Sequence, residues 1–166
     1  MSREEEILEK IKERFGDNVK NIVIKRSRRM FAETDAKHLK EFLRYARHEL
    51  EFDHLSAITG EDLGEEIELI YHIAYQNAIE LSIKTKVPKE DPRIATIVDL
   101  YPSAGIYERE VHDLLGVVFD GNPDLSPLLL PDNWPRGVYP LRKDVSLEEI
   151  REIVERGGGR GERLDD

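Results

Sequence analysis

The sequence contains no cysteine. Disulfides, thiolate zinc sites and ordinary iron–sulfur ligation are therefore excluded from this chain. The histidines include no pair at the helical spacing that would place two imidazoles on one helix face; they are His38, His48, His54, His72 and His112. We therefore expect no metal, no cofactor and no redox centre here, so that any electron chemistry belongs to a neighbouring protein.

Long apolar runs are also missing. No stretch approaches the ~20 apolar residues of a membrane span, and the N-terminus lacks the apolar segment of a signal peptide. We expect a cytoplasmic chain that does not insert into the membrane.

Basic side chains are outnumbered. Lys and Arg total 25 against 35 Asp and Glu, which gives a net charge of -10. Such a chain repels a phosphate backbone on average, so nucleic acid is not an expected partner. The one basic run, residues 25–29, is either a local patch for an anionic surface or a charged hairpin turn, and the turn is the commoner identity. Charged residues make up 36% of the chain, a bias found in proteins from hot environments.

Apolar spacing in the first 50 residues predicts two helices with a pair of strands between them. Residues 3–15 carry an apolar stripe at helical spacing, and Ser2 with Glu5 forms a capping box at its start. Residues 18–25 and 30–33 are predicted strands that flank the basic run as a hairpin. Asp35 is a good N-cap for the second helix. Its apolar stripe is Leu39, Phe42, Leu43, Ala46 and Leu50.

Strands dominate residues 52–88. A strand over 52–59 is followed by a polar turn at 60–64, and strict alternation then predicts two strands, 67–75 and 79–87, that pair as a hairpin with one buried face. This order of elements favours an α+β fold, a mostly antiparallel sheet with helices packed on one side.

The character of the sequence changes after residue 93. Helical spacing continues in Ile94, Ile97, Val98 and Tyr101. Pro102 suits the first turn of a further helix, which ends near Gly116. Residues 117–144 show little periodicity but contain five prolines and the only tryptophan, so we predict a long extended arm that lies on another surface.

A last helix is predicted to begin at Ser146 and to stop at the glycines from 157 onward. The expected organisation is an α+β sheet domain over 1–93; a helix, the arm and a C-terminal helix packed on the same core over 94–156; and a flexible tail over 157–166.

The charged helix over 107–116 is the best place to look for chemistry. His112 beside Asp113 and near Glu110 has the composition of an acid–base site, but a charged surface helix often produces that neighbourhood by chance. Arg109 and Asp113 are one turn apart and are placed to pair. The glycines at 157–161 follow a helix instead of leading into one, so they do not form a phosphate-binding loop. We expect no catalytic residue.

An ordered set of motifs runs from residue 101 to residue 144. They are Tyr101-Pro102, Glu108-Arg109-Glu110, Asp113-Leu114, Gly116, Phe119, Gly121, Pro123-Asp124-Leu125, Leu129-Leu130 and Pro140-Leu141-Arg142-Lys143-Asp144. This set resembles the signature of the thirty-kilodalton (C-type) subunit family of respiratory complex I, which includes subunits of membrane-bound hydrogenases and related ferredoxin-linked complexes. The sequence departs from the usual pattern at Asn122 and Tyr139, where that family commonly has histidine, and at Ser126 and Pro127, where arginines are common.

The resemblance implies a peripheral-arm subunit without a cofactor of its own, which docks against a nickel–iron-hydrogenase-like large subunit in a complex that couples electron transfer to ion translocation. An iron–sulfur small subunit is a further expected neighbour, and the nickel–iron or iron–sulfur centres are expected in these neighbours. The departures, the short length and the heat-biased composition favour a membrane-bound hydrogenase or a sulfur reductase over an NADH:quinone oxidoreductase. Such a chain is attached to the cell membrane only through its complex.

For Glu108, Arg109, Glu110 and Asp113 the sequence gives equal weight to contact with the partner and to bracing of their own helix against the arm. The motif residues as a whole are expected either to contact the partner or to brace their own fold. They are Tyr101, Glu108, Arg109, Glu110, Asp113, Pro123, Asp124, Leu128, Leu129, Leu130, Trp134, Pro140, Leu141, Arg142, Lys143 and Asp144. A rival of another class is a free-standing enzyme with a carboxylate site near Glu110 and Asp113. A third possibility is a regulatory or assembly-factor domain that binds transiently.

Overall fold

The computed structural model describes residues 1–157, so all but the first residue of the predicted tail lies outside the described part. Two helices and a hairpin open the chain. The elements are α1 (Arg3–Phe15), a 3-10 turn (Gly16–Asn18), β1 (Val19–Arg26), β2 (Arg29–Thr34) and α2 (Ala36–His48). Ser2 and Glu5 form the predicted capping box, in which the Ser2 side chain accepts from the Glu5 N–H and the Glu5 carboxylate accepts from the Ser2 N–H.

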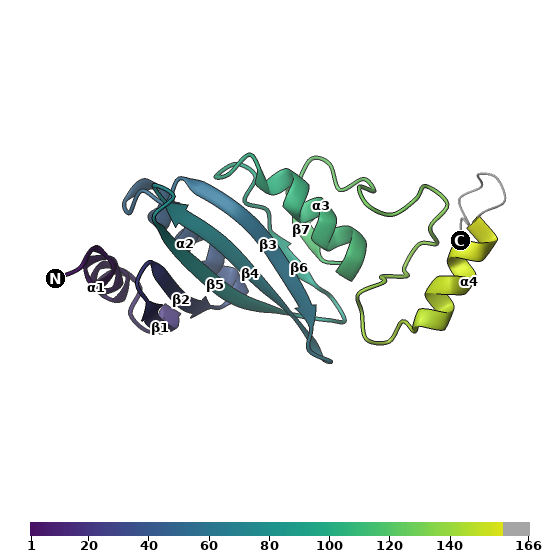
Figure 1. The fold of residues 1–166 in the computed structure, drawn as a ribbon, viewed down its shortest axis with the longest axis horizontal. Coiled ribbons are helices and arrows are strands. Elements are labelled where there is room, and N and C mark those ends of the chain that lie inside the picture. Colours follow the sequence, from purple (N-terminus) through teal and green to yellow (C-terminus); the bar gives the residue numbers. More distant parts are fainter. Residues whose placement is uncertain (158–166) are drawn as a thin grey trace.

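Five strands form the main sheet. The remaining three are β3 (His54–Asp62), β4 (Glu66–Tyr75) and β5 (Ile79–Pro88), and the spatial order is β1-β2-β5-β4-β3. Every neighbouring pair is antiparallel except β2 and β5, which are parallel because the chain crosses through α2 to the far edge before it returns. The predicted α+β class with a mostly antiparallel sheet is therefore confirmed (Figure 1).

One face of this sheet is apolar and covered. On β4 and β5 the alternating residues Ile67, Leu69, Tyr71, Ile73, Leu81, Ile83 and Val87 are buried. Helices α1 and α2 supply the opposing side chains, and Phe15 meets Phe42 edge to face with ring centroids 5.2 Å apart. The other face carries half-buried polar groups such as His72, whose Nδ1 lies 2.9 Å from the Ser82 hydroxyl.

Strand β3 runs further than the sequence predicted. The prediction of a turn at 60–64 is wrong for residues 60–62, because β3 continues through Gly60 and pairs Asp62 with Ile67. Helix α3 (Ala104–Leu115) packs against Gly60 so closely that a Cβ there would lie 2.5 Å from a Leu115 methyl group. The glycine therefore marks a close approach of helix and strand within a strand interior.

The helix expected over residues 94–101 is also wrong. Residues 93–95 form β6 (Arg93–Ala95), which pairs in parallel with β7 (Val118–Asp120) in a second, two-stranded sheet. A single turn follows, in which the Ile97 carbonyl accepts from the N–H groups of Leu100 and Tyr101. The β-branched residues of this segment favour the extended backbone, and pairing with β7 decides in its favour.

Residues 121–146 contain no helix and no strand, and they lead from β7 to α4 (Leu147–Gly157). The arm predicted over 117–144 therefore begins later, because residues 118–120 pair as β7; we call residues 121–146 the arm. The arm and α4 extend to the end of the molecule opposite the N-terminus (Figure 1). No residue of α4 is buried, although Ile150 and Ile153 are half-buried, and the packing of this helix on the same core stays a prediction.

Candidate docking surface

Asp113 fixes the middle of the arm. It lies on the buried side of α3, and its Oδ2 accepts the N–H groups of Leu128, Leu129 and Leu130 at 2.8, 2.8 and 3.3 Å. Hydrogen bonds to a charged acceptor are stronger than neutral ones, and successive N–H groups around one carboxylate define the path of the backbone. Asp113 is therefore bound to its own chain in this structure.

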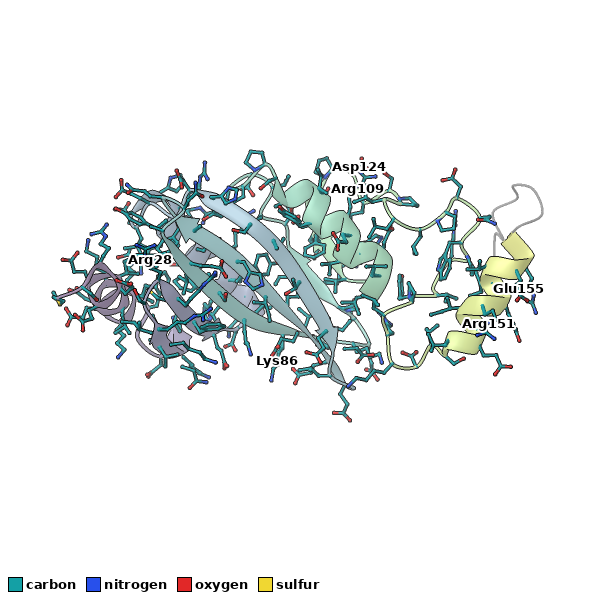
Figure 2. All side chains as sticks on the ribbon, in the orientation of Figure 1. Arg28, Lys86, Arg109, Asp124, Arg151 and Glu155 are labelled. Carbon is teal, nitrogen blue, oxygen red and sulfur yellow. The ribbon has the colours of Figure 1, made fainter. Side chains whose placement is uncertain are left out.

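Arg109 holds the arm one step earlier. Its guanidinium donates to the carbonyl oxygens of Ser126 and Pro127 at 3.1 and 3.0 Å, and no ion pair joins it to Asp113 in the part of the chain described. The expected pairing of Arg109 with Asp113 is thus replaced by two separate contacts to the arm. Figure 2 shows Arg109 close to Asp124, where the arm passes over α3. Arg109 also donates to the Ser126 hydroxyl at 3.3 Å. The two bonds to backbone oxygens do not depend on the side chains at residues 126 and 127, where the sequence departs from the family pattern.

Glu108 anchors the start of the arm and is fully buried. Its carboxylate accepts the Thr96 hydroxyl at 2.6 Å, the Ile97 N–H at 3.1 Å and the Asn122 side-chain amide at 3.3 Å. Burial raises the pKa of Glu108, and the hydrogen bonds from these three residues oppose that shift. Glu108 therefore joins α3 to the turn after β6 and to the first residues of the arm.

The far part of the arm is held at the C-terminus of α3. Gly116 caps the helix in the left-handed region at φ 78°, and the Tyr139 ring covers it so closely that a Cβ would lie 2.5 Å from a ring carbon. Arg142 donates to the Leu115 carbonyl at 2.7 Å, and its guanidinium lies 4.6 Å from the Tyr139 ring centroid. Trp134 Nε1 donates to the Val138 carbonyl at 2.7 Å.

Asp62 is a buried anchor that the sequence did not predict, because residues 60–64 were assigned to a polar turn. Its carboxylate accepts the Lys143 N–H, the Gly64 N–H and the Lys89 ammonium at 2.8, 2.8 and 2.6 Å. Burial alone would raise the pKa of Asp62, but these hydrogen bonds lower it to about 2. Lys89 also pairs with Asp144 at 3.0 Å, so the end of the arm is tied to the end of β3. In the sequence, a single aspartate two residues before Gly64 does not indicate that Asp62 anchors the arm.

The remaining predicted residues fall into three groups. Asp124 accepts a hydrogen bond from the Ser126 N–H at 2.9 Å, a contact within the arm. Tyr101 is buried and donates its hydroxyl to the Phe52 carbonyl at 2.6 Å. A last group is exposed or half-buried and makes no side-chain hydrogen bond or ion pair within residues 1–157. It comprises Glu110, Pro123, Pro140 and the side chain of Lys143. His112, the acid–base candidate, contacts the Val117 carbonyl through Nδ1 at 2.8 Å, with the tautomer open.

Apolar side chains line the outside of the arm and α4. Leu128, Leu129 and Leu141 are 38%, 56% and 56% exposed, and Leu147 and Val154 on α4 are 83% and 60% exposed. Between the arm and α3 lies a hollow of about 320 Å³, lined among others by His112, Leu125, Leu130, Trp134 and Tyr139. Exposed apolar side chains of this kind make the arm and α4 a candidate interaction surface. We call the arm and α4 together the docking surface.

Residues 1–157 lack two kinds of feature. They contain no group of three or more His, Asp or Glu side chains arranged to hold a metal ion. None of the described helices is long and apolar enough to cross a membrane.

Comparison with known proteins places these features in context. The family described as "Respiratory-chain NADH dehydrogenase, 30 Kd subunit" matches residues 32–151. The C-type subunit of the F(420)H(2) dehydrogenase of Methanosarcina mazei is 37% identical over 83% of this chain and 89% of its own length. The membrane-bound hydrogenase subunit beta of Pyrococcus furiosus is 32% identical over 87% of each chain.

Among solved structures, a chain of the membrane-bound sulfane sulfur reductase, an archaeal respiratory membrane complex, superposes with a TM-score of 0.81 at 31% identity. That match covers 99% of this chain and 96% of the other. The C-type subunits of NADH-quinone oxidoreductases match as well, and the chain spans 60% and 49% of the length of two of them. The expected resemblance is confirmed.

Proposed function

Because the chain belongs to the family of the 30 kDa subunit of the respiratory-chain NADH dehydrogenase, we propose that it is a non-catalytic subunit that docks on the large subunit of a related oxidoreductase complex. The large subunit is of the nickel–iron-hydrogenase type, and an iron–sulfur small subunit lies beside it. The metal centres belong to those neighbours, and this chain holds them in place from the periphery of the membrane.

The observation that carries the proposal is an apolar surface on a segment whose backbone is already fixed. Asp113, Arg109 and Arg142 set the path of the arm, yet Leu129 and Leu147 remain exposed beside it. A segment that is already ordered before association gives up little conformational entropy on binding. Less of its interaction free energy is then spent on ordering the chain. The rigid arm is therefore suited to present leucine side chains to a partner.

The choice of complex follows the relatives. A membrane-bound hydrogenase, a sulfane sulfur reductase and an F420H2 dehydrogenase each contain a similar chain of nearly the same length. We favour a complex of this archaeal kind, a hydrogenase or sulfur reductase with ion translocation in its membrane part. The alternative is the equivalent position in an NADH:quinone oxidoreductase.

The rival enzyme with a carboxylate site near Glu110 and Asp113 has less support. One oxygen of Asp113 already accepts three backbone N–H groups, and Glu110 has no basic partner within the described residues. A catalytic base is normally positioned by a second group that hydrogen-bonds to it, and no such group contacts Glu110 within the described residues.

The test uses two apolar residues of α4 that face solvent. Leu147→Ser with Val154→Ser should reduce recovery of the large subunit and its nickel in an affinity purification of the complex, because each apolar side chain buried at an interface contributes roughly 1.5–3 kcal/mol. The melting temperature of the isolated chain should stay unchanged, since neither side chain is buried.

The matched control is Val23→Ser, which removes an exposed apolar side chain from β1 at the other end of the molecule. Val23→Ser should leave the recovery of the large subunit and its nickel unchanged. Full recovery of the large subunit with the double variant would argue against docking through α4, and turnover by the isolated chain would favour the enzyme.

A further inference from the structure

A basic hollow lies at the end of the molecule away from the docking surface. The turn between β1 and β2 carries the basic run, and it faces the turn after β4 and the start of β3. Together they line a hollow of about 590 Å³ whose polar walls include Arg26, Ser27, Arg28, Arg29, His54 and Asn77. Figure 2 shows Arg28 at the opposite end from Arg151 and Glu155 of α4.

The positive charge of this hollow is only partly neutralised. Glu80 pairs with Arg29 across the parallel strands. The guanidinium groups of Arg26 and Arg28 are exposed and form no ion pair within the described residues. Two arginines that line one hollow without an ion pair stand out in a chain with a net charge of -10.

The turn is held rigid by its neighbours. The Arg28 N–H donates to the Glu4 carboxylate at 2.9 Å, and this hydrogen bond is the main reason that the pKa of Glu4 lies below its usual value. The Arg28 carbonyl accepts the Glu80 N–H, also at 2.9 Å. The two contacts fix the backbone from both sides, so the arginine side chains are presented from a preorganised turn.

Arg28 occupies a backbone conformation that disfavours it. Its φ is 66°, in the left-handed region, where a turn position is ordinarily taken by glycine or asparagine. A residue that carries this conformational cost suggests that its side chain has a function. The run is therefore a hairpin turn, and it also supplies the local basic patch that the sequence left as the alternative.

We propose that this hollow binds an acidic segment of a second protein, whose carboxylates accept paired N–H groups from Arg26 and Arg28. The planar guanidinium fork matches a carboxylate bidentately. A concave site with side-chain donors from Asn77 and His54 suits a protruding chain better than a flat bilayer, which would reach only the rim. The site does not depend on docking by the arm, and both surfaces can be occupied at once.

The probe is a fluorescein-labelled hexaglutamate peptide, titrated into the full-length chain at low ionic strength and followed by fluorescence anisotropy. Arg26→Gln with Arg28→Gln should weaken binding by about tenfold or more, because both charge-assisted contacts are lost. The control Lys10→Gln with Lys37→Gln removes the same charge from exposed helix positions and should change binding by about twofold or less.

Equal weakening by both pairs, or no saturable binding by the unmodified chain, would overturn the proposal. Phosphatidylserine vesicles provide the second arm of the experiment. Binding of vesicles that depends on Arg26 and Arg28, without binding of the peptide, would assign the hollow to a lipid surface and would also overturn it. Unchanged melting temperatures confirm that each variant is folded.

Discussion

In the sheet body, residues 1–120, apolar side chains such as Phe42 and Tyr71 are wholly buried, whereas in the arm, residues 121–146, no side chain is. The arm instead keeps its place through charged side chains of the body that bind its backbone, chiefly Asp113, Arg109 and Asp62. The stability of the body is spread over many contacts. The position of the arm depends on a few.

This difference has a consequence for function. Apolar burial is non-directional and tolerates small shifts, while a hydrogen bond fixes an angle and a distance. Binding the arm through its backbone also leaves its leucine side chains free to face outward. The molecule thus holds a segment in a defined shape without using up the apolar surface that a partner needs.

The largest effect should come from the body. Phe42→Ala removes a ring buried between α1, α2 and the sheet and should lower the free energy of unfolding by about 3–5 kcal/mol. Urea unfolding followed by circular dichroism measures it. Phe31→Ala, on the half-exposed sheet face, is the matched control and should cost clearly less. Equal losses would mean that the covered face does not dominate stability.

A second, more local effect should follow Asp113→Ala. The Leu128, Leu129 and Leu130 N–H groups lose their acceptor, which should destabilise the seated arm by about 2 kcal/mol while the sheet stays folded. Amide hydrogen exchange by NMR should show faster exchange at these three residues and unchanged exchange in β4.

Glu110→Ala removes an acidic side chain one turn earlier that makes no such contact, and it should leave arm exchange unaltered. If Asp113→Ala instead accelerated exchange throughout β4, the arm and the body would form one cooperative unit, and the distinction between them would fail.

The same distinction explains what the sequence predicted well. Regular apolar spacing located α1, α2, β4 and β5 within a residue or two, because burial of one face imposes that spacing. The segment 94–101 was assigned wrongly, since its pairing partner β7 lies more than 20 residues later and local spacing carries no information on it. Tertiary pairing overrode local preference there.

The candidate site was predicted in part for a similar reason. Motif resemblance identified Glu108, Arg109, Asp113 and Arg142, but whether they bind a partner or their own arm depends on three-dimensional contacts. All four contact their own chain in the structure. The sequence did not predict the roles of Asp62 and Lys89, because their partners are distant in sequence. Asp62 contacts Lys143, and Lys89 pairs with Asp144.

The last of these effects, similar in size to that of Asp113→Ala at pH 5 but lost near pH 2, concerns Asp62, the joint between body and arm. Its pKa of about 2 lies below the ordinary value of 3.8, so the ionised form stabilises the fold above pH 4, and this contribution is lost as the pH falls toward 2. By linkage the difference amounts to about 2 kcal/mol. Asp62→Asn should therefore be less stable than the unmodified chain at pH 5 by about that amount, and the gap should close near pH 2.

Urea midpoints measured at several pH values for both chains give this gap directly. Glu61→Gln, an exposed neighbour, should show no pH-dependent gap. A gap that stays constant down to pH 2 would mean that the Asp62 charge is not what ties the end of β3 to Lys143 and Lys89. In that case packing, and not charge, would hold this end of the arm, and the contrast between the two regions would be confined to the contacts of α3.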